Sequence, residues 1–142
     1  MAKPLKAPRK KAEPKVVTSA PAVSRQDAAE ARESALFIAH LGLDKKALDV
    51  LLLDVRGLSS YTDYCVVMTA ESDPQVNAIA DFVEAKMKER GERPIGIEGR
   101  QAGQWVLIDY GDVVAHVFYQ DMRLFYDLEG LWADAPRVAV RD

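Results

Sequence analysis

The sequence is poor in the residues from which disulfides and metal sites are built. Its 142 residues include one cysteine, Cys65, and two histidines, His40 and His116. A single thiol forms no internal disulfide and no cysteine-rich zinc site, which favours a reducing compartment. The histidines are far apart, and no cluster of other metal-ligating residues accompanies either one, so their spacing predicts no metal site. The sequence therefore gives no reason to expect a bound cofactor.

Long apolar runs are also missing. No run approaches the roughly 18 residues that a membrane-spanning helix needs, and no apolar signal-peptide core follows Met1. We therefore expect a cytoplasmic protein without a membrane contact.

Charge is present but unevenly distributed. Residues 1–26 hold seven lysines or arginines and one acid, a net charge of +6, so the rest of the chain carries −9 of the total of −3. This arm also has four prolines and no aromatic residue, which predicts a disordered basic arm over 1–26. It is compatible with a solvated tail, a phosphate-binding arm or a transit peptide. The acidic body favours a basic partner.

Apolar runs alternate with turn signals over the remainder. They predict one α/β (α+β) domain over 27–134, with a mixed β-sheet flanked by helices and a C-terminal tail over 135–142. The run 48–55 is nearly continuous in apolar residues and predicts a strand buried on both faces. We expect helices over 25–41, 72–91 and 121–132, and strands over 48–55, 64–69, 94–97, 105–110 and 113–119.

Two local signals support these assignments. Ser72 followed by Asp73 and Pro74 is typical of a capped helix start. Gly111–Asp112 between two β-rich runs predicts a hairpin.

The acidic residues do not have the spacing that metal-dependent nucleotidyl transfer requires. Such enzymes place two carboxylates two residues apart on one strand, so that both point to the same side. A Gly-Ser loop at 57–60 precedes Asp63, but no second acid follows at that spacing, and Asp54 fails in the same way. Asp109 is separated from the next acid by the hairpin turn. We therefore predict no enzyme, and keep a nucleotidyltransferase or nuclease as the alternative.

Trp105 and Tyr110 stand near polar turns. Trp105 follows the glycine-rich turn 99–104, and Tyr110 lies at the predicted hairpin. Because Trp and Tyr often anchor protein interfaces, we expect both to be exposed there. The alternative is that Trp105 packs within the sheet.

The last predicted helix is apolar on two faces and therefore needs two partners. One face holds Met122, Phe125 and Tyr126, and the other holds Leu124, Leu128 and Leu131. One face is expected to cover the sheet, and the other to meet a second copy of the chain or to be covered by Trp132 and the C-terminal tail. The candidates for dimer contact or packing are Met122, Leu124, Leu128 and Leu131.

Several separate motifs together resemble a known family. In order they are Asp44–Ala47, Leu53–Tyr64, Ser72–Asp73, Gly96–Gly99, Trp105–Val114 with His116 and Phe118, and Tyr126–Trp132. They are similar to the ribosomal silencing factor family (RsfS, or Iojap-like) over about residues 32–133. The sequence departs from the family pattern at Cys65, at Ala70–Glu71 and at Pro74, all away from the predicted hairpin.

The resemblance implies a nucleotidyltransferase-like fold without catalytic carboxylates. It also implies a protein that binds the large ribosomal subunit through ribosomal protein uL fourteen. Bound there, it would sterically block association of the subunits and repress translation when nutrients are scarce. A homodimer is implied for the free protein. The expected partner-binding residues are Trp105, Leu107, Asp109, Tyr110, Gly111 and Asp112. A large-subunit biogenesis factor stays an alternative. The basic arm lies outside the resemblance and is a candidate for a contact with ribosomal RNA.

Overall fold

A six-stranded mixed sheet forms the centre of the computed structural model, which describes residues 25–140, without the side chains of residues 25–28 and 128. The strands lie in the order β3-β4-β5-β2-β1-β6, and only β2 and β5 pair in parallel. This confirms the predicted α/β fold with a mixed sheet. The elements are α1 (Arg25–Asp44), β1 (Leu48–Asp54), β2 (Tyr64–Ala70), α2 (Asp73–Glu89), β3 (Gly96–Glu98), β4 (Trp105–Asp109), β5 (Val113–Tyr119), α3 (Gln120–Tyr126), α4 (Leu128–Leu131) and β6 (Arg137–Val138).

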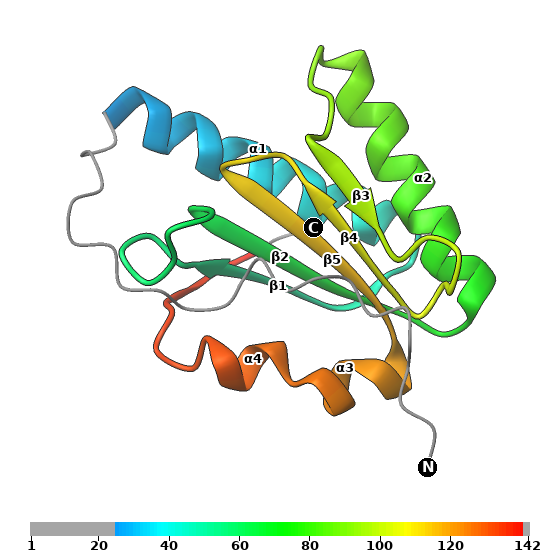
Figure 1. Cartoon of the computed structure of the whole chain (residues 1–142). Helices are drawn as coiled ribbons and strands as arrows, with labels where there is room; N and C mark the ends of the chain where they lie inside the picture. Colours follow the sequence, from blue (N-terminus) through cyan, green and yellow to red (C-terminus); the bar gives the residue numbers. More distant parts are fainter. Residues whose placement is uncertain (1–24, 141–142) are drawn as a thin grey trace.

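Helices cover both faces of this sheet (Figure 1). The α1–α2 face carries the larger core cluster, and the α3–α4 face carries a smaller one. The predicted disordered arm lies outside the described residues, apart from the two that begin α1. Strand β6 was not predicted and lies within the expected tail. Within residues 25–140, no helix is long and apolar enough to cross a membrane.

Helix α2 forms for the local reasons that the sequence shows. Ser72 is its N-cap, and its hydroxyl accepts a hydrogen bond from the Gln75 amide at 3.2 Å, with proline in the first turn. Five apolar residues at helical spacing form its buried face: Val76, Ile79, Ala80, Val83 and Met87. The predicted start and apolar face of this helix are both confirmed.

Helix α1 continues past its predicted end to Asp44. Gly42 was expected to follow the helix but lies inside it. A Cβ atom built at Gly42 would lie 2.2 Å from the Met68 sulfur, so this glycine allows the helix to approach β2 closely. The chain turns instead at Lys46, which has a φ of 65°. The glycine signal marked a packing contact rather than a helix end.

Strand β1 corrects the prediction of a strand buried on both faces. Leu48 and Asp49 are exposed, and complete burial begins only at Leu52. Asp49 has a φ of 49°, and the register with β2 shifts between Leu48 and Leu51. The first half of β1 is at an edge because β6 pairs only with Leu52 and Leu53. The strands buried along their whole length are β2 and β4.

The last predicted helix is broken into α3 and α4 at Asp127. This residue has a φ of 46°, and its carboxylate accepts a hydrogen bond from the Gly130 amide at 3.1 Å. Met122 packs against the α3–α4 face cluster, whereas Leu124 is 84% exposed and Leu131 is also exposed. The side chain of Leu128 lies outside the described part. Phe125, predicted to share a face with Met122, is exposed as well.

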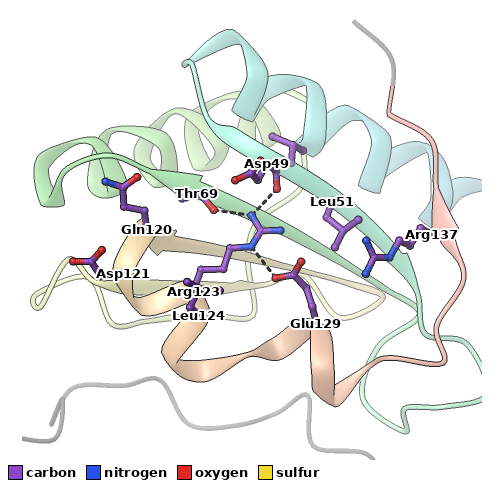
Figure 2. Close-up of a pocket in the computed structure, with 10 residues that line it drawn as sticks. Asp49, Leu51, Thr69, Gln120, Asp121, Arg123, Leu124, Glu129 and Arg137 are labelled. Carbon is purple, nitrogen blue, oxygen red and sulfur yellow. Dashed lines mark hydrogen bonds and ion pairs between the residues drawn. The ribbon is translucent and has the colours of Figure 1, made fainter.

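Arg123 attaches α3 to the sheet (Figure 2). It is buried, and its Nη1 donates to the Asp49 carbonyl and to the Thr69 hydroxyl. Its Nε donates to the Glu129 carboxylate at 2.9 Å, which lowers the pKa of Glu129. One guanidinium therefore joins α3, α4, β1 and β2.

We expect Arg123→Met to lower the free energy of unfolding by about 2 kcal/mol, because it leaves a buried hydroxyl and a carbonyl without their charged donor. Urea denaturation measures this. Arg137→Met is the control, since Arg137 lines the same pocket with an exposed side chain and should change stability by less than about 0.5 kcal/mol. Equal losses in the two variants would contradict the role given to Arg123.

Candidate docking surface on the β4–β5 hairpin

The hairpin between β4 and β5 closes as predicted at Gly111–Asp112. The Tyr110 amide donates to the Val113 carbonyl at 2.9 Å, and Gly111 has a φ of 92°. The Asp109 carboxylate accepts a hydrogen bond from the Gly111 amide at 2.8 Å. Asp109 thereby fixes the conformation of the turn, which needs glycine at the left-handed position.

Trp105 and Tyr110 do not share a surface. Side chains alternate along a strand, so Trp105, Leu107 and Asp109 lie on the α3–α4 face and Tyr110 on the opposite face. In agreement, Trp105 belongs to the α3–α4 face cluster, and Tyr110 packs against the α1–α2 face cluster. Five residues of strand also separate them by roughly 16 Å. Trp105 and Tyr110 therefore lie at opposite ends of β4 and do not form one aromatic contact surface.

Trp105 is 4% exposed, which corrects the expectation of an exposed anchor. Its ring stacks on Phe118 at a centroid distance of 4.9 Å and lies 4.4 Å from the ring of Tyr126 in α3. Leu107 and Asp109 are buried as well. The alternative, that Trp105 packs within the sheet, is confirmed, and one of the rings that cover it comes from an element that follows later in the chain.

Of the six expected contact residues, only the three in the turn are accessible to solvent. Asp112 is exposed, and Tyr110 and Gly111 are half-buried. The Tyr110 hydroxyl has no hydrogen-bond partner among the described residues, and burial raises the pKa of this phenol. The structure thus divides the six predicted residues into a buried support and an exposed turn.

His116 in β5 contacts the buried Trp105. The Trp105 indole donates to His116 Nδ1 at 3.1 Å, which places the proton of the neutral ring on Nε2. That Nε2 is buried and has no partner within residues 25–140. Burial lowers the pKa of His116 to about 3, although the charge of Asp109 opposes the shift. The imidazole is therefore neutral at neutral pH.

The β1–β2 loop lies beside the hairpin turn and was missed as part of the site. The amides of Asp63 and Tyr64 both donate to the Asp112 carbonyl, at 3.0 and 3.1 Å. This loop carries Tyr61, which is 44% exposed. Burial and the nearby Asp112 carboxylate raise the pKa of Asp63. The sequence feature that could have revealed this loop is Tyr61, an aromatic residue within the polar turn 59–62.

The other acids considered for metal chemistry do not converge. Asp54 forms an ion pair with Arg56 at 2.7 Å, which contributes to lowering its pKa although burial acts the other way. Across residues 25–140, no group of three or more His, Cys, Asp or Glu side chains is arranged to hold a metal ion. Burial raises the pKa of the Cys65 thiol to about 12.

Comparison with known proteins agrees with this architecture. The family described as "Ribosomal silencing factor during starvation" matches residues 28–142. The ribosomal silencing factor RsfS of Bacillus subtilis is 46% identical over 93 residues, which are 66% of this chain and 79% of that protein. A crystal structure of a Chromobacterium violaceum protein is 36% identical with a TM-score of 0.67, covering 80% of this chain and 92% of that one.

A more distant relative carries a different name. The mouse "Mitochondrial assembly of ribosomal large subunit protein 1" is 30% identical over 91 residues, 62% of this chain and 40% of that protein. Fold and surface together define a mixed-sheet α/β protein with a rigid hairpin at one end of its sheet. With the family match over 28–142, the chain belongs to the ribosomal silencing factor (RsfS) family.

The depressed pKa of His116 predicts a pH-dependent stability. Between about pH 6.5 and about pH 3, the unfolded chain binds a proton at this histidine and the folded chain does not, so stability falls as the pH falls. His116→Gln keeps an acceptor for Trp105 and cannot titrate. From about pH 7.5 to about pH 5, we expect the wild type to lose up to about 2 kcal/mol more than this variant in urea denaturation. Parallel profiles would show that His116 is protonated in the fold.

Proposed function

We propose that this protein is a ribosomal silencing factor that binds the large ribosomal subunit through ribosomal protein uL fourteen. Bound there, it blocks association of the small subunit and represses translation under nutrient limitation. The observation that carries the proposal is the exposed turn Tyr110–Asp112, which is rigid and lies within the region matched to the family. A rigid turn loses little conformational entropy when it binds.

The mechanism requires no chemical step. The factor occupies surface that the small subunit needs, and its affinity must only be high enough to compete. A standard interface buries roughly 1,600 Å² in total, more than a hairpin turn alone provides. The neighbouring β1–β2 loop supplies further surface on the same end of the sheet. The negative charge of the body favours a basic ribosomal protein and disfavours direct phosphate contact.

The six residues of the expected contact set take two roles in this proposal. Tyr110, Gly111 and Asp112 touch the partner. Trp105, Leu107 and Asp109 support them from below, because all three are buried. Asp109 does so directly, through its hydrogen bond to the Gly111 amide.

Two further contacts belong to the proposal. The exposed Leu124 and Leu131 form the contact between two copies in a free homodimer. The basic arm adds a salt-sensitive contact with ribosomal RNA.

A large-subunit assembly factor is the second candidate, favoured by the printed name of the mouse relative. Both functions use the same contact on the large subunit. They differ in timing, since an assembly factor leaves before the subunits join. A sucrose gradient of purified mature subunits separates them. A silencing factor holds the subunits apart, whereas an assembly factor leaves their joining unchanged.

Tyr110→Ala should weaken binding to the large subunit by tenfold or more, because truncation of an interface aromatic commonly costs about 2 kcal/mol. Tyr119→Ala is the matched control, since Tyr119 is also a half-buried tyrosine on the α1–α2 face cluster, at the far end of β5. Cosedimentation measures binding, and thermal unfolding shows that both variants fold. Equal binding by the two variants would contradict the proposed contact. Failure of the wild type to keep the subunits apart would contradict silencing itself.

Removal of residues 1–24 leaves α1 whole and takes away most of the positive charge of the arm. We expect the truncated protein to bind large subunits more weakly at low salt and equally well at high salt, because phosphate contacts are screened. Cosedimentation across a salt series measures the difference. An identical salt dependence for both proteins would exclude the contact with RNA.

A further inference from the structure

The β1–β2 loop exposes an aromatic side chain on a well-ordered backbone. The Ser59 hydroxyl accepts a hydrogen bond from the Tyr61 amide at 3.0 Å, and the amides of Leu58 and Ser59 donate to the Val55 carbonyl. The Val55 amide in turn donates to the Asp63 carbonyl at 2.9 Å. The loop is thus closed on itself by hydrogen bonds, although Tyr61 stays 44% exposed. Aromatic side chains held in this way are typical of interface anchors.

The loop is continuous with the hairpin turn. The Asp112 carbonyl accepts hydrogen bonds from the amides of both Asp63 and Tyr64, and Tyr64 pairs with Val113 where β2 and β5 begin. These bonds fix the position of Tyr61 relative to the turn. A partner that docks on the turn therefore meets the loop without a change in backbone conformation.

The shared end of the sheet is acidic. Asp63 and Asp112 directly precede the paired residues Tyr64 and Val113, and the charge of Asp112 acts on the Asp63 carboxylate. Within residues 25–140, the Asp63 carboxylate accepts no hydrogen bond, and burial and the Asp112 charge raise its pKa. The adjacent cation, Arg56, is engaged by Asp54 through two hydrogen bonds from its guanidinium. The charge of Arg56 offsets only part of the cost of keeping this acid ionised, because the pKa of Asp63 is still raised.

We propose that Tyr61, Asp63 and Asp112 receive a lysine or arginine side chain of the basic ribosomal protein on the large subunit. The inference rests on the proposed function and extends the contact beyond the hairpin. A carboxylate pair supplies charge-assisted hydrogen bonds to a cation, and a tyrosine ring face stabilises the same cation. The negative field repels phosphate, so a protein rather than RNA occupies this surface.

The test uses the full chain and purified large subunits. Asp63→Asn and Tyr61→Ala should each weaken binding by about tenfold, and Tyr61→Phe should keep it, because the ring face is retained. Asp121→Asn is the charge-matched control, since Asp121 is exposed and lies at the far end of β5, where α3 begins. It should bind like the wild type. The deficit of Asp63→Asn should shrink as salt increases.

A measurement of stability separates binding from folding. Asp63→Asn removes repulsion between like charges, so its unfolding midpoint should equal or exceed that of the wild type. A lower midpoint that accounts for the lost binding would overturn the inference.

Two binding outcomes would overturn it as well. Wild-type affinity in both Asp63→Asn and Tyr61→Ala would remove the loop from the contact and leave the hairpin proposal standing. Tighter binding by Asp63→Asn would show that phosphate faces the loop. If the wild type itself does not bind large subunits, the proposed function fails before the loop is tested.

Discussion

The parallel pairing of β2 with β5 is the constraint on which the surface of this protein depends. β2 is buried on both faces, and its seven residues pair in register with β5. Because the two strands run in the same direction, both begin at the same end of the sheet. The β1–β2 loop and the β4–β5 turn, far apart in sequence, therefore meet there and share the Asp112 carbonyl. An antiparallel pairing would place them at opposite ends.

The alternation of side chains along β4 sends the residues of one continuous sequence motif to opposite faces of the sheet. Odd-numbered positions from Trp105 to Asp109 enter the α3–α4 face, where an aromatic cluster and a neutral histidine surround the tryptophan. Tyr110 turns to the opposite face and reaches the surface at the turn. The motif therefore combines buried residues with residues that reach the surface, and a loss of binding after its mutation needs a stability measurement before it is interpreted.

Features set by neighbouring residues could be predicted from the sequence, and features set by distant residues could not. The cap at Ser72, the apolar face of α2 and the Gly111–Asp112 turn depend on contacts within a few residues. Gly42 was wrongly predicted to follow the helix, because the reason for a glycine there is its close contact with Met68, on a strand that follows later. The burial of Trp105 likewise depends on tertiary contacts, because the rings that cover it belong to Phe118 and Tyr126. Tyr61 was missed because the pairing that places it beside the turn is not local.

The two ends of the sheet suit different kinds of contact. The end with the turn carries backbone-locked loops and acidic side chains, which favours a precise contact with a basic protein. The opposite end exposes Leu48 and Leu124 beside a pocket braced by Arg123, which suits apolar association between copies. Leu131, in contrast, ends α4 beside Trp132, which packs in the same cluster as Val55 and Leu58 at the β1–β2 loop. A dimer contact that extends to Leu131 would therefore approach the surface proposed for the ribosomal partner.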